Sequence, residues 1–171
     1  VIMASGCGKR FGSNKLLVKF QDKALYQRAF DITEGIFQKR VVVTRTQEVY
    51  ESAKNQGIDA IFHELPNRND VVRLGIERMK DMDACVFCPC DQPLLTRDSV
   101  QCLVNAFRLE KRKIIRLAWK ERPGTPILFD RSCFEELCKL PEKKGGAYLA
   151  VTYPDKVAYV QVREEKELMI L

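Results

Sequence analysis

The 171-residue sequence lacks the features that mark several large classes of protein. It has no run of about 18 apolar residues, so no transmembrane helix is expected. It shows no secretory signal pattern. Nine glycines and seven prolines are too few for a collagen-like or low-complexity chain. The single histidine, His63, stands at the end of a predicted strand without a nucleophile-elbow motif nearby, so a structural role is favoured over nucleophilic catalysis.

Cysteine is more frequent, but the seven cysteines do not form a spaced disulfide framework. Cys85, Cys88 and Cys90 fall inside an apolar run, which favours reduced thiols in a cytoplasmic protein. Zinc sites usually need a second ligand pair. In a strand, Cys88 and Cys90 would face one side and Cys85 the other. Small buried strand residues are therefore favoured over a zinc site.

The charge is concentrated at one end of the chain. Apolar residues make up 46% of the sequence and charged residues 30%, which is a folding composition. The formal net charge is +6, and residues 1–45 carry nine basic and three acidic side chains, so the remainder is balanced. A solvated basic face is the plain interpretation, and a local anion site is the functional one. Nucleic-acid binding is a weaker alternative, because no recognition motif is present.

The sequence alternates between predicted strands and helices. Strands are expected at 1–4, 41–44, 58–63, 84–88, 114–119 and 157–162, with a short apolar segment at 127–129. Helices are expected at 24–37, 47–56, 71–82, 98–111, 132–140 and 144–151, the third with Asp70 as its N-cap. This alternation predicts one α/β domain over residues 1–171, Rossmann-like, with three layers and a mainly parallel sheet. Ligands bind at the carboxyl ends of such strands, so the loops after the first and fourth strands are the places to look for chemistry.

The first of these loops is rich in glycine and in cations. Glycines at 6, 8 and 12 allow a close backbone approach, and the basic side chains of Lys9, Arg10 and Lys15 suit phosphate oxygens. The spacing fits neither a Walker A loop nor the Rossmann fingerprint, which it misses by one residue. It does fit G-x-G-x-R-[FLM]-G-x-x-K after a strand. An ordinary strand-to-helix turn is the structural alternative.

With Met3-Ala4-Ser5-Gly6, Arg10-Phe11-Gly12 and Lys15-Leu16-Leu17, the chain resembles the MobA-like nucleoside triphosphate transferases, above all the molybdenum cofactor cytidylyltransferases. The resemblance spans nearly the whole chain and implies a nucleotidyltransferase fold. The implied reaction transfers CMP from CTP to the phosphate of a molybdopterin-type cofactor, with Mg²⁺ and with release of pyrophosphate. CTP is favoured because guanylyltransferase relatives carry a Gly-Gly pair where this chain has Ala4-Ser5-Gly6.

The second loop carries Asp91, just past an apolar strand. Mg²⁺ commonly binds one or two carboxylates together with substrate phosphates, so Asp91 is the best metal-ligand candidate. Capping of the next turn is the alternative role. The resemblance implies that Asp91, in Asp-x-Pro, holds Mg²⁺ on the nucleotide. It also implies a second acidic motif just after the segment matching Glu167–Leu171, beyond the residues of this sequence.

Further residue roles follow from the resemblance alone. The implied catalytic residues are Arg10, Lys15 and Asp91. The implied nucleotide contacts are Ala4, Ser5, Gly6, Gly8, Lys9, Gly12, Asn67 and Asp70. The implied acceptor pocket comprises Gln92, Pro93, Gly124 and Pro126.

Two other functions stay open on the sequence. One is a guanylyltransferase or another sugar- or alcohol-phosphate nucleotidyltransferase. The other is a non-catalytic module that binds a nucleotide or cofactor. The expected partners are the nucleoside triphosphate, the molybdopterin-type acceptor and a molybdoenzyme or chaperone that receives the product. Neither nucleic acid nor a membrane is expected as a partner.

Overall fold

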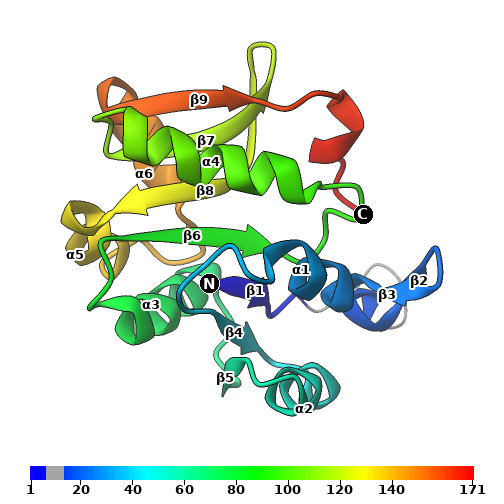
Figure 1. Cartoon of the computed structure of the whole chain (residues 1–171). Helices are drawn as coiled ribbons and strands as arrows, with labels where there is room; N and C mark the ends of the chain where they lie inside the picture. Colours follow the sequence, from blue (N-terminus) through cyan, green and yellow to red (C-terminus); the bar gives the residue numbers. More distant parts are fainter. Residues whose placement is uncertain (7–13) are drawn as a thin grey trace.

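The computed structural model, which describes residues 1–6 and 14–171, has a seven-stranded sheet between two layers of helices (Figure 1). From edge to edge the strands are β5 (Asp59–Phe62), β4 (Val41–Thr44), β1 (Ile2–Ala4), β6 (Ala84–Pro89), β8 (Arg122–Asp130), β7 (Ile114–Trp119) and β9 (Val157–Gln161). Only β8 runs antiparallel to its neighbours among these strands. The predicted α/β class with a mainly parallel sheet is confirmed.

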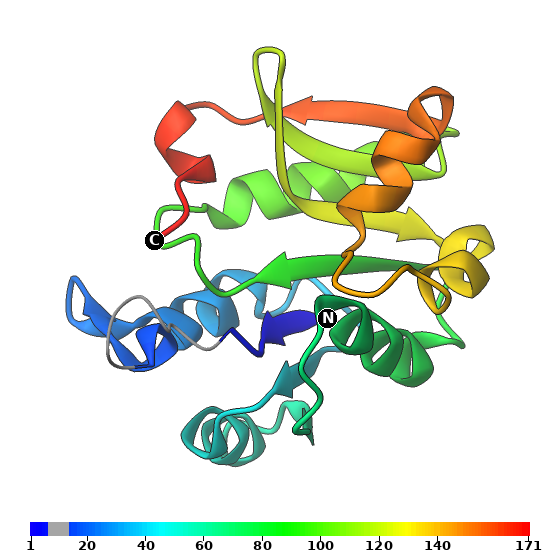
Figure 2. The same ribbon diagram turned by 180° about the vertical axis from the view of Figure 1, so that it is seen from behind.

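The helices cover both faces of the sheet. On one face lie α1 (Leu25–Thr33), α2 (Gln47–Asn55) and α4 (Arg97–Leu109). On the other lie α3 (Arg68–Met79), α5 (Phe134–Leu137) and α6 (Ala147–Thr152), as the view from behind shows (Figure 2). Strand β4, a run of three valines and a threonine, is buried on both faces, as expected for a parallel strand covered by helices.

Short elements complete the chain. A hairpin of β2 (Lys19–Phe20) and β3 (Lys23–Ala24) precedes α1. The 3₁₀ turns are η1 (Lys15–Leu17), η2 (Arg131–Cys133), η3 (Pro154–Lys156) and η4 (Glu165–Leu168). The alternation predicted for the three clustered cysteines is confirmed, because Cys85 packs in the core beneath α3 and α5 whereas Cys88 packs beneath α4.

Several predicted boundaries were wrong. Helix α3 begins at Arg68 with Asn67 as its N-cap, not with Asp70. The Asp70 carboxylate accepts the Asn67 N–H at 3.2 Å from inside the first turn. The helix predicted over 24–37 ends at Thr33, because Glu34 has an extended backbone.

Two further differences lie near the carboxyl-terminal half of the sheet. The short apolar segment predicted at 127–129 is the end of a nine-residue strand, β8, which begins at Arg122 and pairs with β7 around a register shift between Arg116 and Ala118. The helix predicted over 132–140 is the turn η2 followed by the four residues of α5, and the helix predicted over 144–151 begins at Ala147.

Candidate functional site

A cleft of about 770 Å³ opens at the carboxyl ends of β1, β4 and β6. Its walls come from the ends of these strands, the start of α3, strand β8 and the loop before α6. A volume of this size lies within the range of small-molecule sites, roughly 300–1,000 Å³. Its position is the one that open parallel sheets use for ligands.

The charged lining of this cleft is mostly basic. Among the described residues, the charged side chains that line it are Lys15, Arg45, Arg68, Lys143 and Asp91. Only the last is acidic, and within the described parts of the chain it forms an ion pair with Lys15 alone. Four cations around one carboxylate leave an excess of positive charge, which favours an anionic ligand.

Lys15 and Asp91 bring the two predicted loops together. The Lys15 Nζ lies 3.2 Å from the Asp91 Oδ2, and the two side chains are 20% and 26% exposed. Lys15 begins the turn η1, whose cap is Asn14, with the Asn14 Oδ1 accepting the Leu16 N–H at 3.1 Å. Asp91 follows β6 directly. The ammonium group and the carboxylate therefore meet at the edge of the sheet where both were expected.

The carboxyl-terminal segment reaches the same point. The Lys15 Nζ donates to the Leu171 carbonyl at 3.1 Å, and the Leu171 N–H donates to the Asp91 carbonyl at 2.9 Å. Ile170 lines the cleft beside them. This segment thus forms one wall of the site around the Lys15–Asp91 pair.

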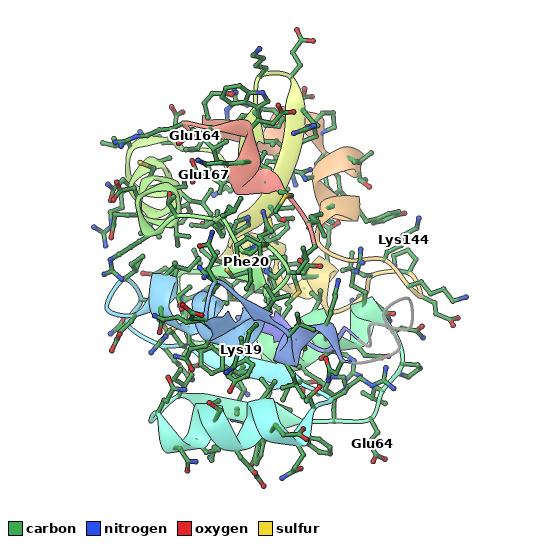
Figure 3. The ribbon with its side chains drawn as sticks, turned by 90° about the vertical axis from the view of Figure 1, so that its right-hand side faces the viewer. Lys19, Phe20, Glu64, Lys144, Glu164 and Glu167 are labelled. Atoms are coloured by element: carbon green, nitrogen blue, oxygen red, sulfur yellow. The ribbon has the colours of Figure 1, made fainter. Side chains whose placement is uncertain are left out.

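A buried carboxylate holds the carboxyl-terminal segment in place. The Glu167 Oε1 accepts the hydroxyls of Thr96 and Ser99, each at 2.6 Å, at the start of α4. Figure 3 labels Glu167 on the red segment beside this helix. Burial alone would raise the pKa of Glu167, but the hydrogen bonds from Ser99 and Thr96 outweigh it, and the pKa lies below its ordinary value.

The predicted nucleotide contacts are only partly gathered at the cleft. Ser5 and Gly6 line it, whereas Ala4 is fully buried and its carbonyl accepts the Thr44 hydroxyl at 2.7 Å. Asn67 also lines it. The Asp70 side chain instead bonds the Asn67 N–H and the Arg73 guanidinium. Of the remaining predicted residues, Gly8, Lys9, Arg10 and Gly12 lie outside the described residues.

The four residues predicted for an acceptor pocket do not line the cleft. Pro93 and Pro126 are buried. The buried Gln92 donates to the Thr125 carbonyl at 2.9 Å and accepts the Thr125 hydroxyl at 2.8 Å. A Cβ at Gly124 would lie 2.8 Å from the Leu168 side chain, so this glycine admits a close packing contact. Gln92 thereby holds Thr125, which does line the cleft.

Among the polar side chains of the lining, sequence reasoning missed four: Arg45, Arg68, Lys143 and Thr125. Arg68 packs across the backbone of Gly145, where a Cβ would lie 2.6 Å from the Arg68 Cδ. The Lys143 N–H donates to the Asn69 Oδ1 at 3.0 Å, which ties the loop before α6 to the start of α3. The cations were visible in the sequence, but their convergence depends on contacts between distant segments.

The donor set at the cleft suits Mg²⁺ better than zinc. Asp91 supplies one carboxylate, and Mg²⁺ is commonly held by one or two carboxylates together with substrate phosphates. Within residues 1–6 and 14–171, no group of three or more His, Cys, Asp or Glu side chains is arranged to hold a metal ion. Burial raises the pKa of Cys88 to about 12 and also raises that of Cys85, and the two side chains pack on opposite faces of the sheet, so they do not converge on one ion.

Comparisons with known proteins agree with this architecture. The family model described as "MobA-like NTP transferase domain" matches residues 1–157. A probable molybdenum cofactor guanylyltransferase of Halalkalibacterium halodurans is 22% identical over 149 residues, covering 84% of this chain and 75% of the relative. A molybdenum cofactor guanylyltransferase of Aliivibrio fischeri is 34% identical over 110 residues, covering 63% of this chain and 56% of the relative.

Solved structures share the fold. Rv0371c from Mycobacterium tuberculosis superposes with a TM-score of 0.84 at 21% identity, over 94% of this chain and 86% of that one. A nucleotidyl transferase from Methanothermobacter superposes with a TM-score of 0.81 at 16% identity, over 99% of this chain and 89% of that one. In the described part of this chain, no helix has both the length and the apolar character needed to span a membrane.

Proposed function

This chain belongs to the family of MobA-like NTP transferase domains, and on that premise we propose that it transfers CMP from CTP to the phosphate of a molybdopterin-type acceptor. In this reaction an acceptor phosphate oxygen attacks the α-phosphorus of the nucleotide. A new P–O bond forms, the bond to the bridging oxygen of the β-phosphate breaks, and pyrophosphate leaves. The coarser activity, nucleotidyl transfer, is that of the family.

One observation carries the proposal: Lys15 and Asp91 meet at 3.2 Å inside a cleft whose other charged lining residues, among those described, are all basic. Phosphoryl and nucleotidyl transfer needs positioning and charge neutralisation more than covalent catalysis. Lys15 would stabilise the negative charge that develops on the α-phosphoryl group. A bound triphosphate would then replace Asp91 as the partner of the Lys15 ammonium group.

Asp91 would hold Mg²⁺ on the phosphates. The ion would neutralise phosphate charge and orient the leaving group. Asp91 is suited to this role because its side chain reaches the cleft directly from the end of β6 and its one charged partner among the described residues is Lys15. We assign Arg10 and Lys9, whose basic side chains suit phosphate oxygens, to the departing pyrophosphate.

Three further cations line the cleft besides Lys15. Arg45 follows β4, Arg68 begins α3, and Lys143 lies in the loop before α6. None of the three has a carboxylate within ion-pair distance among the described residues. We assign them to the phosphates of the two substrates, which together bring more negative charge than Lys15 can balance.

The base specificity rests on the Ala4-Ser5-Gly6 stretch, which resembles the cytidylyltransferases and lacks the Gly-Gly pair of guanylyltransferases. The names of the two curated relatives favour GTP instead. GTP is therefore the second candidate nucleotide, and it leaves the reaction class and the site unchanged.

The test measures pyrophosphate release from CTP, GTP, ATP and UTP in turn, with and without molybdopterin and Mg²⁺. We expect release with CTP only when acceptor and Mg²⁺ are both present. Release with GTP and with none of the other three nucleotides would make GTP the substrate and leave the reaction class unchanged. Nucleotide binding without release from any of the four would contradict the proposal and favour a non-catalytic binding module.

A further inference from the structure

His63 makes two hydrogen bonds that fix the position of its ring proton. It is buried, at 8% exposure, and follows β5. The Leu65 backbone N–H donates to its Nδ1 at 3.1 Å, so Nδ1 carries no proton. A neutral imidazole then carries its proton on Nε2. The Nε2 lies 2.7 Å from the Ser5 Oγ, close enough to donate to it.

Ser5 connects His63 to the sheet through a second hydrogen bond. Its hydroxyl donates to the Val43 carbonyl on β4 at 3.1 Å. Since a hydroxyl has one proton, the bond between Ser5 and His63 must run from the ring nitrogen to the oxygen. A directed chain therefore leads from the Leu65 N–H to His63, from His63 to Ser5, and from Ser5 to Val43.

Ser5 is a wall of the cleft, whereas His63 is not among its lining residues. We propose that His63 is a positioning residue for the nucleotide, acting in its neutral Nε2–H form through the Ser5 hydroxyl. The proposal rests on the assignment of the cleft to a nucleoside triphosphate. It gives the lone histidine a part in binding, where the sequence favoured a purely structural role.

Protonation would break the chain at its first bond. A proton on Nδ1 would face the Leu65 N–H, and two donors cannot share a hydrogen bond. Burial lowers the pKa of His63, and the charge of Arg45 lowers it further. Asp70 on α3 acts in the opposite direction. These are the charged side chains among the described residues that act on the ring, and because burial and Arg45 outweigh Asp70, the pKa of His63 lies below its ordinary value.

Two substitutions separate the two hydrogen bonds. His63→Gln keeps an N–H donor near the position of Nε2, while His63→Asn keeps an acceptor near Nδ1 but cannot reach Ser5. We expect the Kd for Mg-CTP, or for Mg-GTP if GTP is the substrate, to rise about tenfold in His63→Asn, the size of one lost hydrogen bond. His63→Gln should stay close to wild type. Glu64→Gln, at the exposed neighbouring position labelled in Figure 3, is the matched control.

Ser5→Ala tests the same chain from its other end and does not alter the histidine. Combined with His63→Asn, it should raise the Kd no further than Ser5→Ala alone, because Ser5→Ala already removes the bond to His63 together with the bond to Val43. A merely structural histidine would lower stability without changing the Kd, so denaturant unfolding is measured alongside. Unchanged nucleotide affinity in both His63→Asn and Ser5→Ala would overturn the proposal.

The single histidine also permits a direct spectroscopic test. In ¹⁵N-labelled protein without an affinity tag, the two ring nitrogens of His63 can be assigned without ambiguity. We expect the Nε2–H tautomer at pH 7 and at pH 6.5, where a free imidazole is half protonated. An Nδ1–H tautomer or a charged ring at pH 7 would overturn the proposal. These readouts need no turnover, so a failure of CMP or GMP transfer with intact nucleotide binding would refute the proposed function only.

Discussion

The two polar contacts that flank β1 differ in charge and in burial. Lys15 and Asp91 form an ion pair that is about one quarter exposed, beside the end of β6. Ser5 and His63 form a neutral hydrogen bond on the side of β4 and β5, and the ring is buried. Ion pairs with this much exposure contribute at most about 1 kcal/mol to stability. A ligand can therefore separate Lys15 from Asp91 at a small cost in free energy, whereas the hydrogen bond between Ser5 and His63 stays in place.

This difference suggests that the two contacts have different roles in the cleft. When the substrates bind, Lys15 would contact phosphate oxygens in place of Asp91, and Asp91 would bind a metal ion in place of Lys15. The neutral pair keeps the end of β1 in one position while that exchange takes place. The largest effect on turnover is expected from a change in the charged pair, at Lys15.

Lys15→Ala should reduce kcat by about 10²-fold or more, the usual cost of losing one preorganised charge stabiliser. Stability should change by less than about 1 kcal/mol, because the ion pair is partly exposed. Steady-state kinetics and denaturant unfolding check both statements. Lys144→Ala is the matched control, since this exposed lysine is absent from the cleft lining (Figure 3). Turnover within a few-fold of wild type would remove Lys15 from the mechanism.

Asp91→Asn keeps the shape of the side chain and removes its charge. We expect the Mg²⁺ concentration needed for half-maximal activity to rise by about tenfold or more, because a carboxylate ligand is lost. A titration of activity with Mg²⁺ at saturating substrates measures this. An unchanged Mg²⁺ requirement would show that the ion is held elsewhere.

The double change Arg68→Ala with Lys143→Ala should raise KM by about fivefold and leave kcat nearly unchanged, because these cations enter the cleft from α3 and from the loop before α6 and take no part in the Lys15–Asp91 pair. The effect should weaken as ionic strength increases, since exposed charges are screened over about 8–10 Å at moderate salt. Varying the concentration of each substrate separately identifies the one bound there. Equal effects from Lys144→Ala would argue for general surface charge instead.

Glu167→Gln should have the smallest effect on turnover and act on stability. The amide keeps the size of the side chain but offers an N–H to partners that are themselves donors. We expect a loss of about 1–3 kcal/mol in the free energy of unfolding, the range for hydrogen bonds to a charged group.

The effect of Glu167→Gln on the free energy of unfolding should also depend on pH. The pKa of folded Glu167 lies below the ordinary 4.5, so its stabilisation is complete above that pH and is lost as the pH falls through the folded value. The difference in unfolding free energy between wild type and Glu167→Gln should therefore shrink below pH 4.5. A difference that stays constant down to pH 3 would assign the effect to packing.

Much of the fold could be predicted because it depends on local patterns. The valine run of β4 and the apolar run of β6 were recognisable as buried strands. Strand β8 was harder, because Pro123 and Gly124 are typical turn residues, yet they lie within a strand in which Pro123 pairs with Ala118 of β7. The start of α3 was misplaced by a few residues, since both Asn67 and Asp70 are good cap residues and only the structure shows which one precedes the helix.

The candidate site likewise contains residues that the sequence predicted and contacts that it did not. Lys15 and Asp91 were expected near each other because strand ends converge at one edge of a parallel sheet, and the structure joins them. Gln92 and Gly124 were expected in an acceptor pocket; in the structure Gln92 bonds Thr125 and Gly124 lies against Leu168, and their role toward an acceptor stays a prediction. The bond between Ser5 and His63 links positions 58 residues apart. Side-chain directions across such separations depend on tertiary packing, which local sequence patterns do not determine.

The most direct test of the account follows the nucleotide itself. Enzyme in excess is mixed with molybdopterin, Mg²⁺ and CTP labelled at the α-phosphate, and the reaction is repeated with labelled GTP. We predict that the label moves to the acceptor with one pyrophosphate released per label, and that Lys15→Ala slows this transfer by about 10²-fold. Label that stays in both nucleotides, or that moves equally fast in Lys15→Ala, would contradict the central role given to the Lys15–Asp91 pair.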